Sequence, residues 1–172
     1  IQQARMQVYF IDNEDYFQRK AIFRDKKGDF FEDNDERAIF FARGVLETVK
    51  KLGWSPDIIH CHGWMTSLVP LYAKTTFKDN PLFMDTKIVY SAYDDSFTEE
   101  FSDDFVSKIL FDEVELKHLK SLSQNNYHGL CKLGIDFSDA VIQGGEEMDK
   151  EIKNYIDNTK KPFLEFKDEE EY

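Results

Sequence analysis

The stretch PDIIHCHGWMTSLVPLY, residues 56–72, decides the fold. Its first seven residues contain the β-branched pair Ile58 and Ile59, which predicts a short strand. Ile58 and Ile59 stand side by side, and this predicts burial on both faces of the strand, as in a parallel sheet. The second half predicts a helix over 66–77. A strand that leads directly into a helix is the repeating unit of α/β folds.

The same alternation continues outward on both sides of this stretch. Further strands are expected over 6–12, 87–93 and 139–145, and further helices over 34–53, 103–112, 127–138 and 146–156. Alternating strands and helices predict an α/β fold, a parallel sheet with helices on both faces. Because no internal repeat or low-complexity linker divides the chain, we expect a single domain over 1–160. An acidic, frayed tail is expected over 161–172.

Composition and charge narrow the function classes. The 172-residue chain is 41% hydrophobic, which is enough for a packed core. Its formal net charge of −12 repels phosphates and anionic headgroups, so we expect neither a nucleic-acid nor a membrane partner. No apolar run approaches the roughly 18–20 residues that cross a bilayer. Cys61 and Cys131 form no disulfide framework, which favours a reducing, cytoplasmic location.

Three loops are expected to lie together. Ligands of parallel α/β sheets bind at the carboxyl ends of the strands, beside helix N-termini. That rule selects the loops 60–66, 92–98 and 143–146. Any functional site of this chain is therefore expected where these three loops meet.

A metal site and a thiol site are weak interpretations of the first loop. His60 and His62 alternate along a strand, so they face the same side and can share a zinc ion. A zinc site needs three or four ligands, and no further histidine or cysteine has a matching spacing. We therefore favour a plain strand end and expect no metal. Cys61 points to the other side, where a small buried hydrophobe is commoner than a nucleophile.

The third loop raises the possibility of an anion site. Gly144 and Gly145 follow a strand and precede a predicted helix, and such a place suits a phosphate group. The loop has no P-loop lysine, however, and Glu146 and Glu147 follow at once. A tight turn is the favoured interpretation.

Sugar recognition is the fourth interpretation. Aromatic rings stack on the apolar faces of sugars, while imidazoles and carboxylates bond the hydroxyl groups. A tryptophan after a strand can equally plug the end of the sheet. The substrate-binding candidates are His60, His62 and Trp64 at one strand end, and Tyr93, Asp94 and Asp95 at the next.

Residues 56–72 resemble a segment of the bacterial glycogen synthase and plant starch synthase family. The family pattern is roughly P-D-[IV]-[IV]-H-x-H-D-W-x-[TA]-[AG]-L-x-P-x-Y. The matching positions are Pro56, Asp57, Ile58, Ile59, His60, His62, Trp64, Leu68, Pro70 and Tyr72. Segments 8–19, 32–47 and 130–152 also resemble family segments, among them the D-N-x-x-R helix and the Y-F-x-R loop that precedes it.

This resemblance implies a GT-B enzyme, in which two Rossmann-like domains face each other across a cleft. The family transfers glucose from ADP-glucose to the non-reducing end of an α-1,4-glucan, with retention of configuration and no cofactor. ADP-glucose and the glucan are thus the implied partners. The chain would be part of the N-terminal domain, without its first β-α units, and would need a C-terminal domain to complete it.

The chain departs from the family pattern in all three loops. The family's H-x-H-D-W carries an aspartate where this chain has Gly63, so no carboxylate is available there. The family's T-V-H-N places a histidine at Ala92 or, with a slip of one residue, at Tyr93. Its V-S-P becomes Gln143-Gly144-Gly145. The resemblance therefore assigns no catalytic residue to this chain.

Two hypotheses follow. Either the chain is a divergent glucosyltransferase domain, or it is a catalytically inactive relative that binds glucan or a protein. In both cases we expect no glucose transfer by the 172 residues alone. A sheet edge left without its neighbour would also favour self-association.

Overall fold

The computed structural model describes residues 6–168. A four-stranded sheet forms its centre, in the order β1-β2-β3-β4, and every neighbouring pair is parallel. The strands are β1 (Ile58–His62), β2 (Lys87–Ala92), β3 (Ala140–Gln143) and β4 (Phe163–Leu164). The parallel α/β sheet predicted from the alternating pattern is therefore confirmed.

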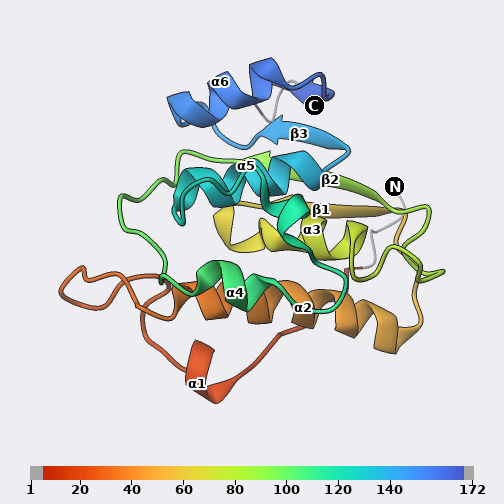
Figure 1. Cartoon of the computed structure of the whole chain (residues 1–172), viewed down its shortest axis with the longest axis horizontal. Coiled ribbons are helices and arrows are strands. Elements are labelled where there is room, and N and C mark those ends of the chain that lie inside the picture. Colours follow the sequence, from red (N-terminus) through yellow and green to blue (C-terminus); the bar gives the residue numbers. More distant parts are fainter. Residues whose placement is uncertain (1–5, 169–172) are drawn as a thin grey trace.

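Four helices form a layer against this sheet, in the same order as the strands. Contacts join α2 to α3, α3 to α5 and α5 to α6, and α2 and α6 lie at opposite ends of the layer (Figure 1). The four helices of this layer are α2 (Asn34–Leu52), α3 (Leu68–Lys74), α5 (Tyr127–Phe137) and α6 (Lys150–Asn158). The two remaining α-helices within residues 6–168 are α1 (Glu14–Phe17) and α4 (Phe105–Ile109). Two short 3-10 helices, η1 (Trp64–Thr66) and η2 (Leu116–Leu119), complete them.

The described helices pack on one face of the sheet. Each crossover moves one strand further in the same direction, and right-handed crossovers then put every connecting helix on the same side. We call this side the covered face. It consists of the buried or half-buried residues Ile59, Cys61, Ile88, Tyr90, Ala92, Val141, Gln143 and Phe163.

The opposite side, which we call the open face, was predicted to carry helices too. Within residues 6–168 none packs there. Ile58 is 61% exposed and Leu164 is 38% exposed, whereas the covered face is buried in the middle of the sheet. The open face consists of Ile58, His60, His62, Lys87, Val89, Ser91, Ala140, Ile142 and Leu164.

Two expectations for the first half of the chain are wrong. Residues 6–12 form no strand, although their alternation suggested one, because no described strand lies beside them to accept their hydrogen bonds. Met6 and Phe10 are more than four-fifths exposed. Ile58 is not buried on its own face, because β1 is an edge strand whose open face carries no helix.

The helix boundaries follow capping chemistry. α2 ends where predicted, at Gly53, whose φ of 65° is the left-handed conformation that glycine tolerates best. α6 begins later than predicted, because the Asp149 side chain accepts hydrogen bonds from the backbone N–H groups of Glu151 and Ile152. Glu146 and Glu147 consequently lie outside the helix. The helix expected over 66–77 is shorter: α3 begins at Leu68 and ends at Lys74, and Thr66 is the last residue of η1.

The tail beyond residue 160 is more ordered than expected. Phe163 and Leu164 pair with β3 as the fourth strand, and the carbonyl of Pro162 accepts a hydrogen bond from the Val141 N–H. The predicted fraying at 169–172 lies outside the described residues. No helix within residues 6–168 has the length and apolarity that a bilayer crossing requires.

Candidate functional site

The three predicted loops lie side by side at the carboxyl ends of the strands. The Gly63 N–H donates to the Ser91 carbonyl over 3.0 Å, and the Gly144 N–H donates to the Ala92 carbonyl over 2.7 Å. These bonds extend the ladder past the strands and fix the loops against one another. The strand-end rule therefore located the meeting point correctly.

A pair of histidines stands on the open face at this end. His60 Nε2 lies 2.7 Å from Ser91 Oγ, and His62 Nδ1 lies 2.8 Å from Tyr93 Oη. The two imidazole rings are 4.0 Å apart. Partial burial, and then the neighbouring His62, lower the pKa of His60, which favours its neutral form. Each ring keeps one nitrogen without a hydrogen bond to any residue of 6–168.

Tyr93 is held in place by a glycine. A Cβ atom added to Gly144 would lie 2.5 Å from the Tyr93 ring, a distance that carbon atoms do not adopt. Gly144 is therefore glycine because Tyr93 passes close to its backbone. The helix beyond it starts only at Lys150, and Asp149 already caps that helix. The tight turn, rather than the phosphate cradle, is the interpretation that this geometry favours.

Trp64 lies beneath the site rather than in it. Only 2% of the residue is exposed, and its ring packs against Phe23 at 4.7 Å and Phe97 at 5.1 Å between centroids. In this arrangement the indole is part of the core. Of the two interpretations given above, the plug of the sheet's end is the one that this burial favours.

Asp94 faces a different hollow. Its exposed side chain lines a depression of about 700 Å3 beside the start of α6. Within this depression His128 Nε2 lies 3.1 Å from Asp149 Oδ2. The other lining residues are Glu147, Met148, Lys150 and Glu151. The hollow is rich in carboxylates, so it suits hydroxyl groups better than anions.

One residue of the site, Tyr127, is absent from the substrate-binding candidates that the sequence offers. Tyr127, the first residue of α5, donates its hydroxyl to Asp95 Oδ1 over 2.9 Å and lies 3.0 Å from the Tyr93 carbonyl. Asp95 is itself one of those candidates, because it follows Asp94 at a strand end. Tyr127 carried no such signal, since 32 positions separate it from Asp95.

The cysteines are unsuited to nucleophilic chemistry. Cys61 is 3% exposed and Cys131 is 1% exposed. Burial raises the pKa of each thiol to about 12, so both remain protonated near neutrality. Across residues 6–168, no three histidine, cysteine, aspartate or glutamate side chains are grouped as a metal ion would require.

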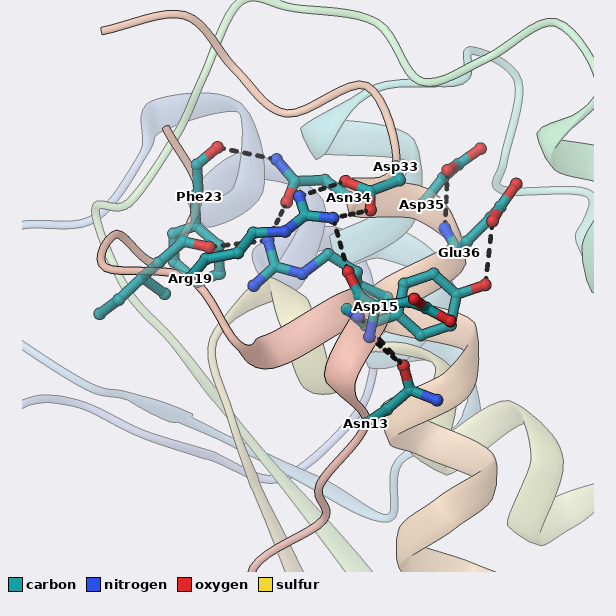
Figure 2. A network of polar contacts seen from close by, with 11 residues as sticks. Asn13, Asp15, Arg19, Phe23, Asp33, Asn34, Asp35 and Glu36 are labelled. Atoms are coloured by element: carbon teal, nitrogen blue, oxygen red, sulfur yellow. Dashed lines mark hydrogen bonds and ion pairs between the residues drawn. The ribbon is translucent and has the colours of Figure 1, made fainter. Parts of the chain in front are cut away.

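Two of the motifs behind the family resemblance meet in a polar junction away from the strand ends. Figure 2 shows Arg19 reaching both Asp33, at 2.8 Å to Oδ1, and the backbone carbonyl of Asp15. Burial opposes ionisation of Asp33, but Arg19 outweighs it and lowers the pKa of that carboxyl. Asn34 Nδ2 donates to the Phe23 carbonyl over 2.9 Å.

This junction fixes the loop 18–33, whose aromatic residues pack against Trp64 behind the strand ends. Arg37 donates to the Asn34 side chain over 2.5 Å and to the Ile22 carbonyl over 2.7 Å, so the loop 18–33 is tied to the start of α2. The same loop carries Phe23 and Phe30, which both pack on Trp64. The motif residues of this region thus build a scaffold rather than a reaction centre.

Comparison with known proteins agrees with this architecture. The family model described as the starch synthase catalytic domain matches residues 1–160. The chain belongs to this family. A glycogen synthase of Elusimicrobium minutum is 36% identical over 148 residues, which are 84% of this chain and 30% of that protein. A glycogen synthase of Chlorobium limicola is 46% identical over 91 residues, which are 52% of this chain and 19% of that protein.

A solved structure shares the fold. The catalytic domain of starch synthase IV from Arabidopsis thaliana, bound to ADP and acarbose, superposes with a TM-score of 0.62 at 21% identity. The match covers 81% of this chain and 31% of that one. The fold is thus that of part of a GT-B catalytic domain. The chain spans less than a third of the length of the relatives named here.

The structure shows where the positions that depart from the family pattern lie. Gly63 is buried, with φ 69° and ψ 176°, a conformation reserved almost entirely for glycine. Ala92 is 1% exposed on the covered face, whereas Tyr93 reaches His62. Of the two positions that match the family's histidine, Tyr93 is therefore the one that faces the site.

Proposed function

We propose that this chain forms the acceptor-side part of a glucosyltransferase that elongates α-1,4-glucans from ADP-glucose with retention of configuration. The observation that carries the proposal is the grouping of His62, Tyr93 and their neighbours at the strand ends, on the scaffold of the starch synthase catalytic domain. A cytoplasmic location and the need for a second Rossmann-like domain belong to the same proposal.

The chemistry of the strand ends supports a sugar ligand. When Tyr93 donates its proton to Nδ1 of His62, Nε2 carries the ring's hydrogen and is available to a sugar oxygen. His60 is directed by Ser91 in the same way. Neutral imidazoles of this kind exchange hydrogen bonds with hydroxyl groups without requiring an ionic ligand.

The surrounding charges support an uncharged ligand at this end. The depression that begins at Asp94 is lined by four carboxylate residues, with Lys150 the one lysine among its lining residues. Carboxylates accept hydrogen bonds from hydroxyl groups and repel phosphates. In the proposal, the glucan therefore approaches these residues, and the nucleotide part of the donor contacts protein outside them.

A second candidate is an inactive glucan-binding relative. Gly63 and Tyr93 favour it, because Gly63 supplies no carboxylate and Tyr93 supplies no imidazole where the family pattern has them. Such a protein would still bind glucan through the histidine pair, but it would not transfer glucose.

One assay separates the two candidates. The whole gene product that carries this chain is incubated with ADP-[14C]glucose and glycogen, and radioactivity in the precipitated glucan is counted. The glucosyltransferase proposal expects incorporation that His62→Ala reduces. Glucan binding without incorporation would select the inactive relative, and the absence of both would contradict the two candidates together.

The 172 residues alone provide a second test. They are expected to incorporate no glucose, since most of the length of the relatives is outside them. Measurable turnover by these residues would contradict the view that the reaction requires a further domain.

A further inference from the structure

A side chain at position 63 would crowd a carboxylate that reaches this position from another loop. A Cβ atom added to Gly63 would lie 3.0 Å from Asp95 Oδ2. Gly63 follows β1, whereas Asp95 follows β2, so the crowding joins two different strand ends. The backbone of Gly63 also adopts φ 69°, which disfavours any side chain. The glycine and the aspartate are therefore linked features of one site.

The Asp95 carboxylate is fixed on its inner side. Oδ1 accepts the hydrogen bond from the Tyr127 hydroxyl at 2.9 Å. The backbone N–H of Trp64 also favours the ionised form. Together these donors hold the carboxylate beside the loop that carries His62 and Gly63. Such anchoring is what a polar group needs in order to bind a ligand without first being ordered.

The outer side of Asp95 is accessible. The residue is exposed as a whole, although the protein around its carboxyl displaces enough water to raise the pKa above the usual aspartate value. An ionised carboxylate in such a place accepts strong hydrogen bonds from hydroxyl groups. It stands at the same strand ends as His62 and Tyr93, which bond to each other.

We propose that Asp95 is the carboxylate that this site offers to a glucan hydroxyl group, supplied from the end of β2 instead of from position 63. This inference rests on the proposed sugar-binding function. It explains why the chain has lost the aspartate of the family pattern at position 63 and still has a carboxylate beside it. Asp95 is then a substrate-binding residue, and Tyr127 is the residue that positions it.

A purely structural role makes a different prediction. η1 starts at Trp64, and its N-cap Gly63 has no side chain to accept a hydrogen bond. In this alternative, Asp95 caps that short helix and has no contact with the glucan. Removing its charge would then change stability and leave the affinity for glucan unaltered.

The test uses the whole gene product and maltoheptaose, a linear α-1,4-glucan, in isothermal titration calorimetry between pH 4.5 and 8. Asp95→Asn keeps the size of the side chain and a hydrogen-bond acceptor for the Trp64 N–H, but it loses the charge. We expect the Kd for maltoheptaose to rise about tenfold, the loss typical of a charged hydrogen-bond partner. The matched control is Asp85→Asn, which removes an exposed carboxylate before the opposite end of β2 and should leave the Kd unchanged.

The pH profile adds a readout that a structural cap would not move. Binding by the wild type should weaken as the pH falls through the pKa of Asp95, which burial and the neighbouring Asp94 raise. Asp95→Asn should remove this limb and leave only the dependence due to His60. Tyr127→Phe removes a hydrogen bond that stabilises the ionised carboxylate, so it should shift the acid limb to higher pH. This variant provides the test even if Asp95→Asn proves unstable.

The outcomes are distinct. Wild-type affinity and pH dependence retained in Asp95→Asn, with a lowered Tm, would show a structural cap and overturn the inference alone. An unshifted acid limb in Tyr127→Phe would also overturn it. A wild type that binds no maltoheptaose at all would overturn the proposed function, and the inference with it.

Discussion

The two faces of the central sheet differ in what their side chains do. On the covered face, the hydroxyl of Tyr90 lies 2.8 Å from Ser67 Oγ and 3.5 Å from Cys131 Sγ, with all three residues buried. On the open face, His60 and His62 each have one partner and one unused nitrogen. Polar groups that are mutually satisfied hold a fold together, whereas unsatisfied groups that reach solvent are available to a ligand.

The largest expected effect compares two isoleucines. Ile88 is 1% exposed on the covered face, so Ile88→Ala should lower the free energy of unfolding by about 2–5 kcal/mol, because it leaves a cavity. Ile58 is 61% exposed on the open face, so Ile58→Ala should change that free energy by less than about 0.5 kcal/mol. Urea denaturation followed by circular dichroism measures both.

Equal losses for the two isoleucine variants would mean that another part of the protein covers the open face. In that case the comparison between a covered and an open face would not hold.

The next effect concerns the close approach of Tyr93 to Gly144. Gly144→Ala should cost about 1–3 kcal/mol of unfolding free energy, the usual range for a group forced into filled space. Tyr93→Ala removes the ring that the new methyl group meets. The double variant should therefore recover much of the loss, which a double-mutant cycle in urea would detect. Simple additivity would contradict the contact.

Neighbouring residues of β1 should separate stability from binding. His62→Ala should raise the Kd for maltoheptaose several-fold and leave Tm nearly unchanged, because His62 is exposed at the strand end. Cys61→Ala should lower stability without affecting glucan binding. It should cost about 1 kcal/mol through lost packing on the covered face and leave the Kd unchanged. Calorimetric titration and thermal melts of both variants test this, and a binding loss in Cys61→Ala would break the comparison.

The smallest effect is a pH dependence of stability. The pKa of His60 is lower in the folded protein than in the unfolded chain, so the unfolded chain takes up the proton first as the pH falls. The stability that the neutral form of His60 contributes is present above the pKa of the unfolded chain, about 6.5, and is lost as the pH falls through the pKa of the folded protein. His60→Gln should flatten that part of the curve of urea midpoint against pH. An unchanged slope would mean that burial of His60 is weaker than the structure implies.

The sequence was most informative about local patterns. Apolar periodicity and an αL glycine predicted α2 from start to end, and alternation of strands with helices predicted the parallel sheet. The rule for strand ends placed His62 and Tyr93 at the same edge of the sheet, where the structure has them hydrogen-bonded. Each of these inferences depends on neighbours within one or two turns, or on a rule of topology.

The errors arose where distant residues decide the outcome. Residues 6–12 have the alternation of a strand, but a strand also needs a partner, which alternation cannot supply. The position of Trp64 after a strand fits both a sugar-facing and a buried residue, and the burial follows from Phe23 and Phe97, which belong to two distant segments. The meeting of Asp95 with Gly63 and Tyr127 depends on three separate elements, and no spacing along the chain encodes it.

The most direct test of the central claim is a titration of the 15N-labelled chain with maltoheptaose, followed by amide chemical shifts. If the strand ends bind glucan, the largest shifts should fall at His62, Gly63, Tyr93 and Asp95, while Ile88 and Tyr90 on the covered face move little. The result that would contradict the account is either saturable binding with shifts elsewhere on the protein, or no shifts at millimolar glucan.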